Sequence, residues 1–248
     1  MPSQMPNLTR GLYTAKLAEN RDEVRETQGL RHLSFRVARG LAPEDGHDSD
    51  KFDAACQHML IRETASNRLV CCYRILPVPA GVAIGHSYSA QFYDLGRLRD
   101  FPGPMLELGR FCLHPDHHDP DILRLAWAAL TRLVDYGEVK MLFGCSSFHG
   151  TDPTPHYPAL AHLAAHHLAP PEWSPGVKGG ETVDLRLLPG RPDPKAMPPL
   201  LQTYLAMGAW VSGHAVIDHE LNTLHVFTGL DISAVPAARA RALRDLAG

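Results

Sequence analysis

The chain has 248 residues, 44% of them hydrophobic and 21% charged, so it is long enough to bury a substantial core. Its formal net charge of −3 excludes the basic field with which proteins bind nucleic acid. No apolar run is long enough to span a bilayer, and the N-terminal residues lack the apolar core of a secretory signal. We therefore expect a cytoplasmic protein of enzyme size.

The predicted elements begin after a flexible leader of residues 1–10. A strand is expected over 12–18, and Asn20 followed by Glu23 predicts a capped helix that runs to about Ala38. Two runs rich in β-forming residues, 58–63 and 68–76, predict an antiparallel hairpin. A long excursion follows, in which we expect a short helix over 89–95.

The second half of the chain alternates strands and helices. Period-2 and continuous apolar runs predict strands at 105–113, 139–147, 182–188, 210–218 and 221–230. Apolar residues at helical spacing predict helices at 121–136, 158–169 and 198–209. The fold class is therefore α/β, a mixed sheet with helices on both faces. We expect a single domain over 11–233 and a C-terminal helical tail over 234–248.

The five cysteines are odd in number, and four of them lie in strand-like runs. They are Cys56, Cys71, Cys72, Cys112 and Cys145. This pattern predicts buried free thiols rather than disulfides.

The predicted strand "MLELGRFCL" carries two opposite charges, Glu107 and Arg110. Burying either charge without a partner costs several kcal/mol, on the order of 3–5. In a regular strand, residues at i and i+3 point to opposite faces, so each side chain needs another partner or a cleft. One interpretation is structural, with Arg110 in an ion pair and Glu107 at a wet strand end. The other places Glu107 in a cleft as a general base.

The strand with its E-x-x-R-F pattern, the preceding "RLVCCYRILP" and the earlier "DSDKFD" resemble the acyltransferase branch of the GNAT superfamily. The downstream segments "LFGCSSFHGTDP", "PPLLQTYLAMGAWV" and "AVIDHELNT" are similar to the ornithine N-acyltransferases that begin ornithine-lipid synthesis. The resemblance covers roughly residues 30–230. It implies a GNAT-like sheet, mostly antiparallel and splayed in the middle. It also implies transfer of a (3-hydroxy)fatty acyl chain from acyl carrier protein to the α-amine of ornithine.

The turn after this strand, "HPDHHDPD", contains no glycine and three carboxylates: Asp116, Asp119 and Asp121. Coenzyme A-dependent GNAT enzymes hold the donor pyrophosphate here with a glycine-rich loop and a helix N-terminus. Carboxylates would repel a pyrophosphate, whereas a carrier-bound phosphopantetheine has a single phosphodiester. The loop therefore favours an acyl carrier protein thioester as co-substrate, with no other cofactor.

The chemistry of this reaction suggests roles for particular residues. Glu107 is the expected catalytic base, with Arg110 beside it in the catalytic motif. The backbone near Phe111, Cys112 and Leu113 is expected to stabilise the oxyanion. Ser146 or Tyr157 is a candidate weak acid for the leaving thiolate.

Acceptor binding requires a cation for the α-carboxylate and an anion for the side-chain ammonium of ornithine. Arg74 and Arg110 are candidates for the first, and Asp50 and Asp53 for the second. A structural ion pair for Arg74 and a solvated capping loop for the two aspartates are the alternatives. Asp218 is either a pocket residue or an ordinary turn residue.

The sequence also leaves other functions open. Fifteen histidines invite a metal site, but His162 and His166 lack the glutamate of H-E-x-x-H, so we expect no metal. An acyl-homoserine lactone synthase, acylation of glutamine, glycine or lysine, and a non-catalytic carrier-protein or membrane-binding module remain alternatives. The expected partners are acyl carrier protein, a free amino acid and, through the arginine-rich tail, transiently the inner membrane face.

Overall fold

The computed structural model describes residues 6–41, 46–189 and 191–248. These residues form a mixed sheet of strand order β1-β2-β3-β4-β6-β7-β11-β10-β9 and a separate two-stranded pair of β5 (Tyr93–Asp94) and β8 (Gly176–Val177). β6 and β7 run parallel, and the other registered pairs are antiparallel. The mixed, mostly antiparallel sheet predicted from the sequence is confirmed.

The chain divides into two compact units: unit 1 comprises residues 1–77, 108–139 and 237–248, and unit 2 comprises 78–107 and 140–236. β6 (Met105–Leu113) contributes to both. The expected domain bounds of 1–10, 11–233 and 234–248 stay a prediction.

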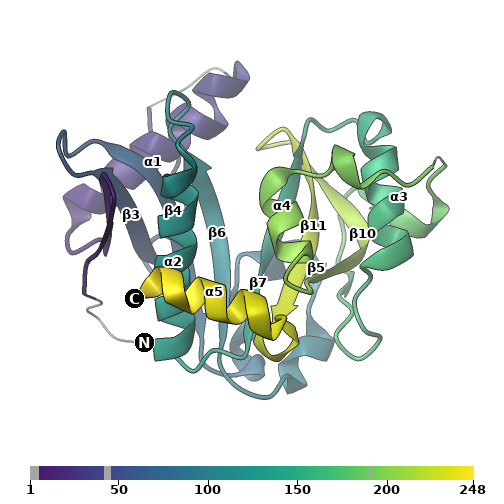
Figure 1. Ribbon diagram of the computed structural model, residues 1–248. Helices are drawn as coiled ribbons and strands as arrows, with labels where there is room; N and C mark the ends of the chain where they lie inside the picture. The colour runs from purple at the N-terminus through teal and green to yellow at the C-terminus, as the bar shows by residue number, and fades with distance from the viewer. Residues whose placement is uncertain (1–5, 42–45, 190) are drawn as a thin grey trace. The chain divides into compact units, whose positions relative to one another are not determined.

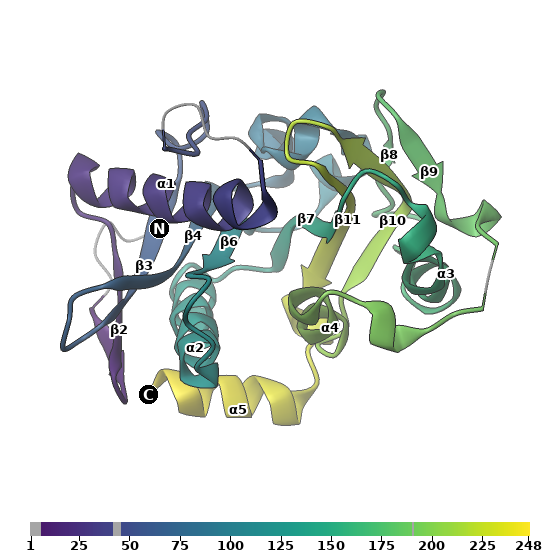
Figure 2. The ribbon, with the colours of Figure 1, turned by 90° about the horizontal axis from the view of Figure 1, so that it is seen from above.

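Unit 1 is a sheet between two helices. Its strands are β1 (Leu8–Arg10), β2 (Tyr13–Leu17), β3 (Gln57–Glu63), β4 (Leu69–Val78) up to Pro77, and β6 from Leu108. Figure 2 shows α1 (Arg21–Phe35) and α2 (Pro120–Tyr136) on opposite faces of these strands. Neighbouring residues of β4 show why: Cys72 packs with Leu30 of α1, whereas the Tyr73 hydroxyl donates to Ala126 O of α2 at 3.1 Å. Alternation along the strand thus gives each helix its own apolar surface.

The helix starts follow their sequence signals. Asn20 accepts a hydrogen bond from Glu23 N at 3.0 Å, and the Glu23 carboxylate accepts from Glu19 N at 2.8 Å, which confirms the predicted cap.

The tail forms α5 (Ala237–Ala247), which packs on α2 with a two-point ion pair from Arg244 to Asp135 at 2.8 and 2.9 Å. Among the described residues, no helix is both long and apolar enough to cross a membrane.

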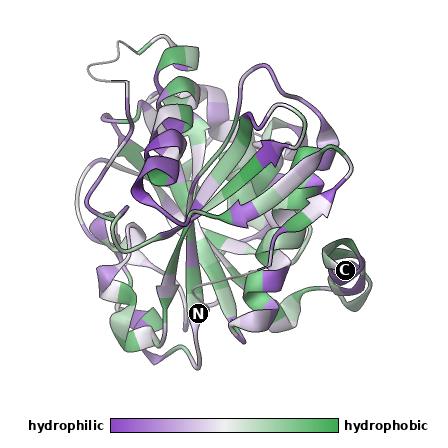
Figure 3. Ribbon diagram, turned by 90° about the vertical axis from the view of Figure 1, so that its left-hand side faces the viewer, coloured by the Kyte–Doolittle hydropathy of each residue, from purple (hydrophilic) through white to green (hydrophobic). Residues whose placement is uncertain are grey.

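Unit 2 builds its sheet from β6, β7 (Met141–His149), β11 (Thr223–Asp231), β10 (Trp210–Asp218) and β9 (Thr182–Asp184). One face packs against α3 (Tyr157–His166) and α4 (Pro199–Leu205), the other against the 3-10 turns of residues 81–100 (Figure 2). Figure 3 shows apolar residues running along the strands and hydrophilic residues concentrated in loops and on helices.

Several local predictions differ from the structure; for example, the helix expected over 198–209 ends at Leu205, and the helix expected to run to Ala38 ends at Phe35. Residues 8–10, expected within the leader, form β1 and pair with β2. The strand expected over 182–188 ends at Asp184, because its carboxylate accepts from Arg186 N at 2.9 Å and begins a 3-10 turn. The helix expected over 89–95 is a single turn, Ser89–Gln91, followed by β5. None of the five cysteines forms a disulfide, as predicted; Cys71, Cys72 and Cys112 are buried as expected, whereas Cys56 and Cys145 are partly exposed.

Candidate active site

Unit 1 contains a buried network of three arginines and three aspartates, which balance in formal charge. At its centre Arg31 of α1, 1% exposed, donates to Asp48 at 2.8 Å and to Asp53 at 2.7 Å. Gln28 donates to the other Asp53 oxygen at 2.9 Å. Burial alone would raise the pKa of Asp53, but the Arg31 charge and the hydrogen bonds of Arg31, Arg74 and Gln28 lower it to about 2. Asp53 is therefore held as a carboxylate.

The outer part of the network contains the other predicted charges. Arg74 of β4 donates to Asp50 at 2.6 Å and to Asp53 at 2.7 Å. Arg110 donates to Asp48 at 3.1 Å and to Asp50 at 3.3 Å. The structure thus brings Asp50, Asp53, Arg74 and Arg110 together, but as partners of one another. Their roles toward the acceptor stay a prediction.

Arg110 has an unusual backbone for a strand residue, with φ +53°. A left-handed residue interrupts the pleat and re-aims its side chain. The prediction that side chains alternate regularly between the two faces of this strand from Glu107 to Arg110 is therefore wrong at Arg110. Of the three residues that follow it, Phe111 stacks on Tyr73 with ring centroids 5.3 Å apart, Cys112 is buried, and Leu113 O accepts from Ser34.

Glu107 belongs to unit 2 and is the last residue of β6 in register with β7, opposite Phe143. It is 4% exposed. One carboxylate oxygen accepts from Ser89 N at 2.7 Å and Ser89 Oγ at 2.6 Å, and the other accepts from Tyr88 N at 2.8 Å. All three groups are donors, so the site fits an ionised carboxylate.

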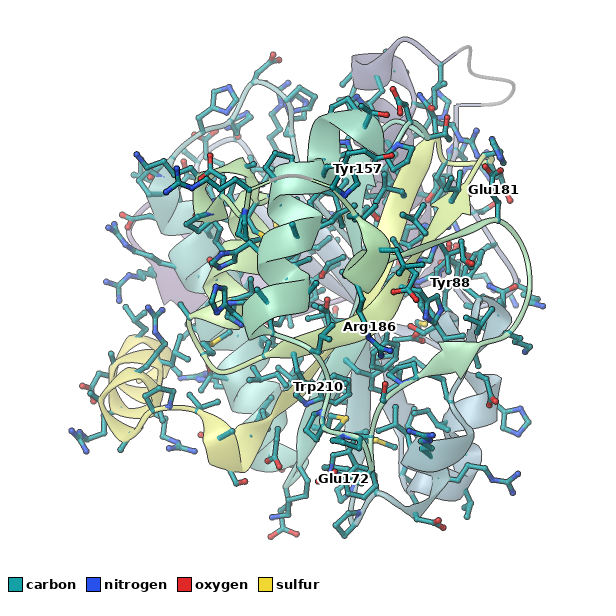
Figure 4. The ribbon with its side chains drawn as sticks, turned by 90° about the vertical axis from the view of Figure 1, so that its right-hand side faces the viewer. Tyr88, Tyr157, Glu172, Glu181, Arg186 and Trp210 are labelled. Atoms are coloured by element: carbon teal, nitrogen blue, oxygen red, sulfur yellow. The ribbon has the colours of Figure 1, made fainter. Side chains whose placement is uncertain are left out.

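In unit 2, the candidate base Glu107 and the two candidate acids, Ser146 and Tyr157, lie on opposite sides of the sheet. Glu107 is paired with Phe143, whose ring belongs to the cluster under the 3-10 turns. Ser146 is paired with Val226 of the opposite cluster, beside α3 and α4, and accepts from Thr228 there at 2.8 Å. Tyr157 begins α3 on that same side; Figure 4 shows it in front of the strands and apart from Tyr88. Neither candidate acid shares the sheet face of Glu107.

Asp218 lies at the β10–β11 hairpin, where its carboxylate accepts from Leu221 N at 3.0 Å. It pairs with Thr223, six residues along β11 from Gly229, and Gly229 lies in the row of Phe143 and Glu107. Six residues of strand span about 20 Å. The contact is that of a turn residue, and a pocket role for Asp218 stays a prediction.

In the loop before α2, the Asp119 carboxylate is turned onto the helix start, whereas Asp116 is exposed and lies 3.8 Å from Arg68. Asp119 caps α2, accepting from Asp121 N at 2.9 Å and from the Tyr13 hydroxyl at 3.0 Å. Pro120, the first helical residue, has no N–H to offer a ligand. Burial and the bond to Asp119 raise the pKa of Tyr13. Among the described side chains, no group of three or more His, Cys, Asp or Glu is arranged to hold a metal ion.

Sequence reasoning missed Arg31, Asp48 and Ser89. Arg31 had a readable signal, because it follows Thr27 by one helical turn on the buried face of a predicted helix. Asp48 stands in the quoted "DSDKFD" segment. Ser89 had none, since its partner lies eighteen residues away, on a strand.

Known proteins resemble this chain in sequence and in fold. Residues 30–128 match the acetyltransferase (GNAT) domain family. The chain is 34% identical over 236 residues to the L-ornithine N(alpha)-acyltransferase of Rhodobacter capsulatus, covering 90% of this chain and 91% of the relative. It is 31% identical to that of Brucella abortus, covering 91% and 86%. The structure of FeeM, an N-acyl amino acid synthase from uncultured soil microbes, has the same fold at a TM-score of 0.55, with 10% identity over 92% of this chain and 97% of FeeM.

These matches span nearly the whole of both chains, and they favour an enzyme over a non-catalytic binding module. They imply an acyl donor and an amino acid acceptor. The chain therefore belongs to the L-ornithine N(alpha)-acyltransferase family and is an acyltransferase.

Proposed function

We propose that the protein transfers a (3-hydroxy)fatty acyl chain from acyl carrier protein to the α-amine of ornithine, giving a lyso-ornithine lipid, the first step of ornithine-lipid synthesis. The observation that carries the proposal is the end-to-end match to relatives named for this acceptor.

The choice of donor rests on the start of α2. A helix N-terminus binds phosphate through free N–H groups and its positive dipole. Here the Asp121 N–H already donates to the Asp119 carboxylate, and the negative charges of Asp119 and Asp121 offset the positive end of the helix dipole. A pyrophosphate would meet negative charge at this place, so the capped helix supports an acyl carrier protein donor. No further cofactor enters the proposal.

In the proposed reaction Glu107 takes a proton from the ornithine ammonium. The freed amine attacks the thioester carbonyl, so a C–N bond forms and the C–S bond breaks. The oxyanion is stabilised by backbone N–H groups near Phe111–Leu113. As it collapses, the nitrogen releases its second proton to solvent, and the departing thiolate takes a proton from solvent. General-base help of this kind contributes roughly 10²–10⁴ in rate.

Acceptor recognition is proposed to use the outer pair of the network. Asp50 and Arg110 have side chains 22% and 11% exposed and the longest contact, 3.3 Å. If ornithine replaced this one contact, the Asp50 carboxylate would bind the side-chain ammonium of ornithine, and the Arg110 guanidinium would bind its α-carboxylate. Arg31, Asp53 and Arg74 are buried more deeply and would hold the pair in place.

Transient contact with the inner membrane face is proposed through α5. Arg239 and Arg241 are exposed and available to anionic lipid, whereas Arg244 is bound to Asp135. Leu243 and Leu246 are half-buried, so the helix offers charge more than apolar surface.

The proposal is tested with purified protein, 3-hydroxyacyl carrier protein or 3-hydroxyacyl coenzyme A, and a panel of ornithine, lysine, glutamine and glycine, with products read by mass spectrometry. We expect N-acyl ornithine from the carrier-protein donor. Preference for another amino acid would refute the acceptor, and equal use of coenzyme A would refute the donor. Formation of an acyl-homoserine lactone from S-adenosylmethionine would show that the protein catalyses a different reaction from the one proposed.

A further inference from the structure

Two residues of the turn Ser87–Gln91, Tyr88 and Ser89, donate hydrogen bonds to Glu107. Ser89 gives two of the three: its N–H at 2.7 Å and its hydroxyl at 2.6 Å, both to one carboxylate oxygen. Its side chain is fully buried. Because serine rotates about one side-chain bond, this pair of contacts fixes both the Ser89 rotamer and the carboxylate plane.

Ser89 has a second polar neighbour, Cys145 of β7, with Oγ and Sγ 3.5 Å apart. The hydroxyl has a single proton, and the ionised carboxylate can only accept. The thiol therefore donates to Ser89, and Ser89 donates to Glu107. This orders a hydrogen-bond chain from β7 through the turn to β6.

The turn is also held independently of Glu107. The Tyr93 hydroxyl donates to His225 O at 2.8 Å, the Lys178 ammonium donates to Ala90 O, and β5 pairs with β8. Ser89 thus sits at the start of a segment that is anchored directly after it, so its hydroxyl does not depend on the carboxylate alone for its position. A preorganised donor of this kind needs no rearrangement when charge changes beside it.

We propose that Ser89 is a positioning residue for the reaction, holding Glu107 in one rotamer and in its ionised state so that it is ready to accept the amine proton. The inference rests on the proposed function, in which Glu107 is the base. Once Glu107 is protonated, its O–H can donate to Ser89, and the serine hydroxyl turns toward the Cys145 sulfur. The turn then accommodates both charge states through rotation of hydrogens alone.

Several described titratable groups of unit 2 lie around the turn and could contribute to this titration. Cys145 faces Ser89 from β7, His225 and Tyr93 lie farther along the same sheet face, and Lys178 contacts the turn from beside β8. Because these groups are unchanged when Ser89 is substituted, a shifted pH profile reports the lost hydroxyl.

The experiment compares Ser89→Ala with Ser89→Thr, which keeps the hydroxyl, and with Ser87→Ala as matched control. Ser87 is buried in the same turn, and its hydroxyl accepts from Ala90 N at 3.2 Å. The pH dependence of kcat/KM is measured with 3-hydroxyacyl carrier protein and ornithine, and urea unfolding checks each fold.

In Ser89→Ala we expect kcat to fall at least tenfold at neutral pH. The acidic limb should move up by about one pH unit, since one hydrogen bond to the charged form is lost. In Ser89→Thr the acidic limb of the pH profile should return to its wild-type position, and in Ser87→Ala it should stay there. If Ser89→Ala does not fold, Ser89→Cys, a weaker donor, should shift the limb in the same direction by less.

A wild-type limb and kcat in Ser89→Ala would overturn the proposal, as would the same shift in Ser87→Ala. Glu107→Gln is run beside them. If it is fully active, the base assignment fails; if it is inactive while Ser89→Ala behaves as wild type, only the role of Ser89 fails.

Discussion

Asp53→Asn is expected to destabilise the protein by removing the charge on which two buried arginines converge. Asp53 accepts from Arg31 and Arg74 at 2.7 Å each, and its side chain is 7% exposed. Its pKa is lowered from an ordinary 3.8 to about 2. At about 1.4 kcal/mol per pKa unit, ionisation of Asp53 contributes roughly 2–3 kcal/mol to the free energy of unfolding.

The sign of the pH dependence follows from the direction of that shift. Because the folded-state pKa is the lower one, the stabilisation is fully present above about pH 4 and is lost as pH falls through about 2. The amide cannot ionise, so the asparagine variant should be less stable by about 2–4 kcal/mol at pH 7. The difference from wild type should shrink between pH 4 and pH 2.

The assay is urea unfolding followed by circular dichroism at pH 7 and at steps down to pH 2. Asp116→Asn is the control, since Asp116 is 77% exposed and lies 3.8 Å from Arg68. It should change stability by less than about 0.5 kcal/mol. An Asp53→Asn variant as stable as this control at pH 7 would show that the network does not stabilise the fold in the way the distances suggest.

Three further predictions follow from single contacts. Glu107→Gln should lower turnover by roughly 10²–10⁴ in the mass-spectrometric assay while carrier-protein binding, measured by calorimetry, is retained; unchanged turnover would remove the base. Gly229→Ala would place a Cβ 2.4 Å from the Trp210 ring and should cost about 1–3 kcal/mol in urea unfolding, whereas Gly85→Ala, with open space around it, should be neutral. Equal effects at the two glycines would contradict the packing. Asp119→Ala removes the cap of α2 and should cost about 0.5–2 kcal/mol; a melting temperature equal to wild type would show that solvent replaces the cap.

The sequence predicted the elements well where periodicity and capping agree with the tertiary structure. Asn20 and Glu23 start α1 as expected, and the apolar runs of β6, β10 and β11 match their strands closely. The errors have local causes, such as the Asp184 side chain that begins a turn inside an expected strand. Short-range competition of this kind is invisible to a pattern of hydrophobicity.

The site was harder to predict because its contacts join distant parts of the chain. Charged residue types pointed to Asp50, Arg74 and Arg110 individually, but spacing gave no indication that they neutralise one another. The face of a strand residue also depends on regular alternation, which fails at Arg110. Residues such as Ser89 become visible only when the turn is placed on the strand.

The backbone of Arg110 offers a last argument for function at this strand. A left-handed conformation costs a residue with a side chain about 1–2 kcal/mol, and glycine at the same place would avoid that cost. Glycine is present one residue earlier, at Gly109, where a Cβ would meet Arg74 at an ordinary 3.5 Å. The chain thus puts the strained conformation on the arginine, where it aims a guanidinium at Asp48 and Asp50. Strain kept at a charged residue, three positions after the candidate base, is the pattern expected where the geometry of an active site takes precedence over stability.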